Sequence, residues 1–375
     1  MASNVAQTVP RRSAVSEISD LLDSPEISAL CAELEALRWT GRKGYGSRAL
    51  VGACLVKSLY AIPTWSRTAA LIAEHRALQE ALGRTPSVYA CYRFTTKLRE
   101  HSEALADCLD SITASLKAEL PEYGHDVAID ASDLPAYANG QRYLSKHGPE
   151  RERYSDPDAS WGHRSAISTR KGGGFYGYRI HAAVCAATDL PLAWRIASAR
   201  EHESLSVPVL LDALDARGFN PATAALDMGY DVNPVYDACQ AHGVVPIIPL
   251  RKTIAVKRGE HGAPTCEHGR WTFAGADFKR NAAKWRCPTG KCEPKSKWIK
   301  ADRRYPLVPR DSRRFRDLYA GRASVEREFG RLKHSWGLGP IRVRGLAKVQ
   351  LHADLVMLAR LAAALARARA VPLAA

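Results

Sequence analysis

The sequence lacks the features that mark membrane, secreted and disordered proteins. It has no run of about 18 apolar residues, and its first residues lack the apolar stretch of a signal peptide. Cysteines are few and odd in number, nine in 375 residues, which argues against a disulfide scaffold and favours a reducing compartment. Hydrophobic residues make up 46% of the chain and charged residues 25%, which excludes a fibrous or disordered protein. We expect a globular, cytoplasmic protein with the length of about two average domains.

Acidic residues are too few to balance the basic ones, because 54 Lys and Arg residues stand against 39 Asp and Glu residues, a net charge of +15. The excess lies in one segment. Residues 251–344 contain 25 basic and 9 acidic residues, a net charge of +16, whereas the remaining residues contain 29 and 30, a net charge of −1. Such segregation favours a surface that binds a polyanion.

Aromatic residues are interleaved with these basic ones, as in proteins that hold phosphates and stack bases: Trp271, Phe273, Phe278, Trp285, Trp298 and Tyr305. Each tryptophan taken alone is better explained as a core residue of a small β-insertion. The segment as a whole indicates nucleic acid as the partner.

The first third of the chain has the apolar spacing of helices. Residues 13–120 are predicted to be almost entirely helical, after a disordered tail at residues 1–12. Thr64 is expected to cap one short helix, and Ser87 opens another that carries basic residues. Short helices joined by tight turns are typical of a helix-turn-helix-like DNA-binding domain, with a plain helical bundle as the alternative.

From residue 121 the pattern changes to strands and helices. Strands are predicted at residues 127–130, 176–187, 192–197, 222–227 and 244–248, with a polar, loop-like stretch at 139–175. Helices are predicted at residues 204–217, 234–242, 317–335 and 347–370. This order predicts an α/β fold, a mixed sheet with flanking helices, over residues 121–346. The basic segment forms an insertion at about 250–315, and residues 347–375 form a C-terminal helix.

Two acids occur in the context of catalytic acids. Asp130 and Asp227 each follow a short apolar strand, where side chains project into the cleft above a sheet. If these two strands are neighbours, the carboxylates lie side by side. They then repel each other unless a proton or a cation bridges them, and a divalent metal with oxygen ligands does so.

A third acid, Glu326, lies on the predicted helix 317–335. Tyr319, Arg322, Glu326 and Lys333 occur at relative positions 0, 3, 7 and 14, which predicts that all four share one helical face. An acid between two cations and a phenol suits a metal ligand beside groups that hold phosphates. Other acids are explained by local structure and are left outside the predicted triad: Asp133, Asp156, Asp158, Asp231 and Glu328.

The basic insertion contains four residues of the types that bind zinc: Cys266, His268, Cys287 and Cys292. They could form a structural zinc site. Their spacing differs from the two-residue spacing of zinc ribbons, which favours free thiols instead.

Residues 123–365 resemble the DDE transposases of bacterial insertion sequences, which have a ribonuclease-H-like catalytic fold. The segment around Glu326 matches the Y-(2)-R-(3)-E-(6)-K signature of that superfamily at all four positions. Further motifs follow in the same order as in the family: DASDLPAY from Asp130, then SDPD, WG, GYRIH, and DMGYD from Asp227. The helical region at 40–100 is similar to the family's N-terminal DNA-binding part.

The resemblance implies roles for these residues. Asp130, Asp227 and Glu326 would be the catalytic, metal-binding triad for Mg²⁺, with Mn²⁺ able to substitute. Tyr319, Arg322 and Lys333 would hold the transposon-end DNA, and a tryptophan of the insertion could stabilise a flipped base. The partners would be double-stranded DNA of the element's ends and of the target, bound by a homodimer. The alternatives are a ribonuclease-H-like nuclease that cuts without joining, and a catalytically inactive DNA-binding repressor.

Overall fold

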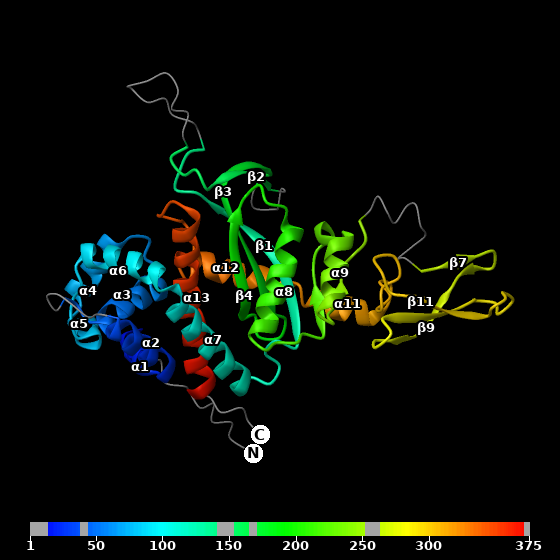
Figure 1. Ribbon diagram of the computed structural model, residues 1–375, viewed down its shortest axis with the longest axis horizontal. Helices are drawn as coiled ribbons and strands as arrows, with labels where there is room; N and C mark the ends of the chain where they lie inside the picture. The colour runs from blue at the N-terminus through cyan, green and yellow to red at the C-terminus, as the bar shows by residue number, and fades with distance from the viewer. Residues whose placement is uncertain (1–13, 38–43, 141–153, 165–170, 252–262, 371–375) are drawn as a thin grey trace, which may run out of the picture. The chain divides into compact units, whose positions relative to one another are not determined.

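The computed structural model describes residues 14–37, 44–140, 154–164, 171–251 and 263–370 (Figure 1). The tail predicted at residues 1–12 lies outside these ranges. The chain forms two compact units. One comprises residues 1–119, 334–338 and 351–375, and the other comprises residues 120–333 and 339–350.

The first unit is helical, as predicted for residues 13–120. Its helices from the first part of the chain are α1 (Ala14–Asp23), α2 (Pro25–Ala36), α3 (Ser47–Leu59), α4 (Trp65–Glu74), α5 (Arg76–Leu82), α6 (Val88–Glu100) and α7 (Ser102–Glu119). The expected caps are present, because Thr64 accepts a hydrogen bond from the amide of Arg67 and Ser87 accepts one from that of Ala90.

The C-terminal helix α13 (Leu346–Ala370) contributes most of its length to this helical unit. Arg369 donates two hydrogen bonds to the carboxylate of Glu26, at 2.7 and 3.1 Å. By length and composition α13 could cross a membrane, but 78% of its most apolar window is buried within the protein, as is usual for a core helix.

The second unit is built on a six-stranded mixed sheet. Its strands are β1 (Asp126–Pro135), β2 (Ser160–Arg164), β3 (Gly173–Cys185), β4 (Pro191–Ser198), β5 (Thr223–Ala225) and β6 (Val245–Ile247). The order is β2-β3-β1-β5-β6, with β4 also paired to β3. The pairs of β3 with β1, β2 and β4 are antiparallel, whereas β5 runs parallel to β1 and β6.

Helices flank this sheet. Helix α8 (Ser206–Ala216) packs on β3 and β4, and α9 (Asn233–Ala241) packs on α8 and β6 (Figure 1). Helix α11 (Arg313–Ala320) contacts β5 and β6, and α12 (Ala323–His334) follows it. The mixed sheet with flanking helices, after an all-helical region, confirms the predicted α/β fold class.

Three predictions about individual elements were wrong. Strand β1 continues to Pro135, so Asp130 lies within the strand and not at its end. The stretch expected to be a loop contains β2, which extends the sheet beside β3. The single helix predicted at 317–335 is two helices, because α11 ends at Ala320 and Gly321 occupies its C-cap.

The insertion between β6 and α11 folds as a small β-structure (Figure 1). It contains a two-stranded ribbon, β7 (Thr265–Cys266) and β8 (Gly269–Arg270), and a three-stranded sheet, β9 (Thr272–Asp277), β10 (Ala282–Arg286) and β11 (Ser296–Lys300). Trp271 and Trp285 are buried in its core, as expected for a β-insertion, whereas the side chain of Trp298 is 49% exposed.

Candidate active site

Backbone pairing places the first two acids side by side. In the parallel pair of β1 and β5, Ala128 lies opposite Ala225. Asp130 lies two residues after Ala128, and Asp227 lies two residues after Ala225. Because side chains alternate along an extended chain, both acids lie on the same face of the sheet as these alanines. The expectation that their strands are neighbours is confirmed. Because β5 ends at Ala225 while β1 continues, the acids lie where the parallel pairing stops.

The surroundings of Asp130 disfavour the ionised form of its carboxyl group. The pKa of its carboxyl is raised from 3.8 to about 7, chiefly by burial. A hydrogen bond from the amide of Ala131 and the charge of Arg322 lower it, whereas the charges of Asp227 and Glu203 add to the rise. The amide of Ala131 lies 2.8 Å from Oδ1 of Asp130. A bound cation would restore the charged form of this carboxyl.

Asp227 is held by the turn that follows it. Its Oδ1 accepts a hydrogen bond from the amide of Gly229 at 2.7 Å and caps a short 3₁₀ helix, Met228–Tyr230. A Cβ atom at Gly229 would lie only 2.8 Å from this same oxygen. The glycine therefore leaves room for the carboxylate to keep its position.

Arg322 connects the first acid to the third. It lies in the turn between α11 and α12, and its Nη1 donates to Oδ2 of Asp130 at 2.9 Å. Its Nη2 donates to Oε1 of Glu326, which lies in the first turn of α12. One guanidinium thus bridges the two carboxylates in the geometry that arginine favours.

The predicted single helical face does not exist, because the chain breaks between α11 and α12. Tyr319 lies in the last turn of α11, stacked on Phe315 with ring centroids 5.9 Å apart. Burial raises the pKa of its phenol. Only Glu326 and Lys333 share α12. Arg322 and Tyr319 approach the acids through the turn, and the charges of Asp130 and Asp227 act on both of them.

Lys333 joins the end of α12 to β1. Its Nζ donates to Oγ of Ser132 at 2.7 Å and to the carbonyl oxygen of Asp133 at 2.6 Å. These partners lie two and three residues beyond Asp130. The lysine therefore fixes α12 against the strand that carries the first acid.

A second anchor of α12 lies in the turn between β3 and β4. Arg327 donates to both carboxylate oxygens of Asp189, at 2.8 and 2.6 Å, and Arg331 donates to one of them at 2.8 Å. Burial alone raises the pKa of Asp189, but these hydrogen bonds outweigh it and hold the pKa below 3.8. Together with Lys333, this cluster sets the position of Glu326.

The structure adds three residues to this site that the sequence analysis missed. Glu203 begins a 3₁₀ turn after β4 and forms an ion pair with Arg179, at 3.0 Å. Burial and the charge of Asp227 raise its pKa, although Arg179 opposes them. Tyr230 is buried beside the same carboxylates, and its hydroxyl has no hydrogen-bond partner among the residues that the structure describes. No spacing in the sequence connects these residues to the other acids.

The acids excluded from the predicted triad have structural partners elsewhere. Asp231 is fully buried and pairs with Arg303 at the end of the insertion, at 2.8 Å. Other contacts hold the remaining four: Asp133 with Arg164, Asp156 with the Tyr178 hydroxyl, Asp158 with the Leu346 amide, and Glu328 with Arg331. These contacts explain the four acids without a catalytic role.

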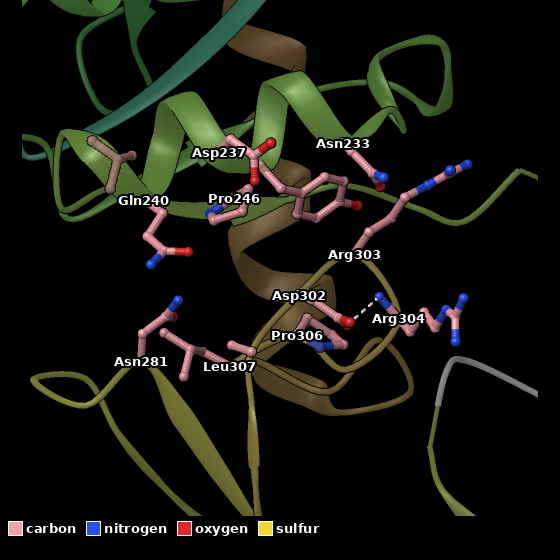
Figure 2. Close-up of a pocket in the computed structure, with 13 residues that line it drawn as sticks. Asn233, Asp237, Gln240, Pro246, Asn281, Asp302, Arg303, Arg304, Pro306 and Leu307 are labelled. Atoms are coloured by element: carbon pink, nitrogen blue, oxygen red, sulfur yellow. Dashed lines mark hydrogen bonds between the residues drawn. The ribbon is translucent and has the colours of Figure 1, made fainter.

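A hollow of about 510 Å³ lies apart from the three acids, between α9 and the loop after β11 (Figure 2). Asn233, Asp237 and Gln240 of α9 line one side of it. Asp302 and Arg304 of the loop line the other, and the amide of Arg304 donates to the Asp302 carboxylate at 2.7 Å. The hollow lies where the insertion returns to the sheet, and it contains none of the predicted site residues.

Comparison with known proteins identifies the family. The model of the transposase DDE domain matches residues 125–362, well over half of the chain and all three acids. No curated protein sequence matches significantly. Among solved structures, the chain is similar to one described as "Cryo-EM structure of piggyBac transposase synaptic complex with hairpin DNA", with 11% identity and a TM-score of 0.40 over 93% of this chain and 74% of that one. By the family match, this chain belongs to the transposase DDE domain family.

Proposed function

We propose that the protein is the transposase of a bacterial insertion sequence. In this role it binds the terminal inverted repeats of the element, cuts DNA at their ends and joins those ends to a target. The observation that carries the proposal is the alignment of Asp130 with Asp227 across β1 and β5, with Glu326 connected to them through Arg322. The family match supports the same chemistry.

The donor set fits a divalent metal. Asp130, Asp227 and Glu326 offer only carboxylate oxygens, which Mg²⁺ and Mn²⁺ prefer. Asp130 is largely buried, and its raised pKa indicates that Arg322 does not fully balance the negative charge of the site. When bound, divalent ions supply activation of the attacking hydroxyl and stabilisation of the leaving oxygen at phosphorus.

The chain's own residues position the DNA. Arg322 lies between two of the acids and carries the donors that suit a phosphate group. Tyr319 and Lys333 flank it, and we propose that they contact the transposon end. On α6 the exposed Tyr89 stacks under Arg93, at 4.8 Å from ring centroid to guanidinium, an arrangement that suits contact with nucleic acid.

The protein would act as a homodimer in the cytoplasm, on chromosomal or plasmid DNA. The two ends of the element must be cut and inserted together, so one active site per end requires at least two protomers. A nuclease without joining activity and an inactive DNA-binding repressor are the competing functions, and the experiment below separates them.

The test uses a labelled duplex that carries the inverted repeat flanking the gene. We expect the protein with Mg²⁺ to cut at the repeat boundary and to join the end to a second DNA. Asp227→Ala should abolish both steps and still bind DNA, whereas Asp237→Asn, an exposed acid on α9, should leave them intact. Cutting without joining would identify a nuclease, and binding without cutting in Mg²⁺ or Mn²⁺ would identify a repressor.

A further inference from the structure

Three cysteines of the insertion converge on one point. The Sγ atoms of Cys266, Cys287 and Cys292 all lie within 4.8 Å of one another, and those of Cys266 and Cys287 are 4.0 Å apart. Sulfurs that share a tetrahedral zinc ion, with Zn–S bonds of about 2.3 Å, are separated by about 3.8 Å. A disulfide requires about 2.05 Å instead. The thiols therefore have the separation of ligands around one ion.

The three sulfurs come from three separate turns. Cys266 ends β7, Cys287 directly follows β10, and Cys292 lies in the loop before β11. The first two each begin a Cys-x-x-Gly turn, whose glycine has a positive φ, +112° at Gly269 and +70° at Gly290. Glycine adopts this conformation without steric cost, so the chain folds back beside each sulfur. Cys266 and Cys287 thus each begin a segment with the same Cys-x-x-Gly pattern.

Among the described residues of the insertion, few apolar side chains are buried. Its buried core consists of Cys287 and four further residues: Ala263, Trp271, Ala283 and Trp285. Phe273, Phe278 and Trp298 are exposed by 40–49%. A β-structure of this size buries too little apolar surface to be stable alone, and such small folds commonly depend on a metal or on disulfides.

We propose that Cys266, Cys287 and Cys292 bind a structural zinc ion that joins the β7–β8 ribbon to the β9–β11 sheet. The spacing of these residues had favoured free thiols, but the fold brings three of them together. Three thiolates leave one position of a tetrahedral ion. His268 lies in the Cys266 turn but outside the cluster, with its Nε2 3.5 Å from the carboxylate of Glu267. The fourth ligand is this imidazole after a side-chain rotation, or water.

The ion would fix the positions of basic and aromatic side chains of the insertion. Lys297 lies 4.7 Å from the ring centroid of Trp271, and Lys284 lies 5.9 Å from that of Trp298. Both tryptophans belong to the small fold that the thiolates hold. The inference concerns folding of the insertion and holds whether or not the protein cuts DNA.

The test measures metal in the purified full-length protein by mass spectrometry. We expect about one zinc per chain after dialysis that removes weakly bound ions. Exchange for Co²⁺ should give a thiolate charge-transfer band with the visible absorption of a tetrahedral site. Cys292→Ser and Cys287→Ser should lose both signals, whereas Cys31→Ser, in α2, and Asp227→Ala should keep them. His268→Ala separates the two candidates for the fourth ligand, because it weakens zinc retention only if the imidazole binds.

A second measurement uses only the wild-type protein, so it does not depend on whether the variants fold. In the wild-type protein, the three thiols should resist alkylation and become reactive together when a strong chelator is added. Wild-type protein without zinc or a cobalt charge-transfer band would overturn the proposal. So would alkylation that is indifferent to the chelator, or unchanged zinc content in Cys287→Ser.

Discussion

The guanidinium of Arg322 donates to Oδ2 of Asp130 across 2.9 Å, and the two residues are separated by 192 positions in the sequence. The same guanidinium also binds Glu326, so the positive charge lies where the acids would otherwise repel one another. Arg322 therefore couples the sheet that carries two acids to the helix that carries the third. This coupling can be tested through the metal dependence of catalysis.

Replacing Arg322 should change metal binding and not only DNA binding. In Arg322→Ala, the two carboxylates lose the guanidinium that lies between them, so a divalent ion no longer competes with this positive charge. We expect the Mg²⁺ concentration for half-maximal cleavage to fall by about tenfold, while the cleavage rate at saturating Mg²⁺ also falls because a phosphate-binding group is lost. Arg322→Lys keeps the charge but cannot bridge two carboxylates, so its Mg²⁺ requirement should lie between those of the wild type and of Arg322→Ala. An unchanged Mg²⁺ requirement in both variants would contradict this role.

Glu203 should contribute to the same site. Its carboxylate acts on both Asp130 and Asp227, so Glu203→Gln removes negative charge from the place where a metal would bind. We expect the Mg²⁺ concentration for half-maximal cleavage to rise about tenfold, with little change in the free energy of unfolding. Glu201→Gln is the matched control, because Glu201 forms its own ion pair with Arg195 at 2.9 Å. If both variants behave alike, Glu203 has only a structural role.

Gly229 should matter for activity through the space beside Asp227. The Cβ of Gly229→Ala would approach Oδ1 of Asp227 to 2.8 Å and displace the carboxylate, which also loses the ideal geometry of its bond to the amide. We expect the cleavage rate to fall at least about tenfold, since small misplacements at a reacting centre are costly. Gly330→Ala in α12, where a Cβ meets open space, should keep full activity. Equal activity of both variants would show that Asp227 tolerates the shift.

Asp189 should make the stability of the α12 anchor depend on pH. Its pKa is lower in the folded protein than in the unfolded chain, so its contribution is complete above the unfolded pKa and is lost as the pH falls through the folded pKa. At pH 7, Asp189→Asn should lower the free energy of unfolding by about 1–2 kcal/mol, a modest figure because both arginines are partly exposed.

Urea denaturation of the two proteins over a pH series measures this effect. The curves should converge as the wild-type carboxylate becomes protonated at low pH. Asparagine is the appropriate substitute because residue 189 has a φ of +58°, which asparagine tolerates. A difference in stability that stays constant at all pH values would exclude the ion-pair explanation.

Much of this site could be predicted because the strands carry local signals. Asp130 and Asp227 each follow apolar residues of a strand, and the strand order then makes them neighbours. The break at Gly321 could not be predicted from spacing, since positions 319, 322 and 326 fit a continuous helix as well as the observed turn.

Residues that meet only through the fold could not be found from the sequence. Glu203 lies 73 positions after Asp130 and reaches it only because β3 and β4 bring the following turn back to the sheet. The sequence spacing of Cys266 and Cys287 likewise matches no common metal-binding motif. Their thiols meet because β10 runs antiparallel to β9. In both places, tertiary pairing and not a local motif sets the chemistry.

The parallel pairing of β1 with β5 also fixes the order in which the site can form during synthesis. Asp130 and Asp227 become neighbours once β5 has paired, but Glu326 is separated from Asp227 by 98 further residues. Segments nearer the N-terminus leave the ribosome first and begin to fold earlier. A nascent chain thus holds two facing carboxylates before Arg322 arrives to neutralise them. On the proposed mechanism, a polypeptide truncated within the insertion would lack the third acid and could not cut DNA.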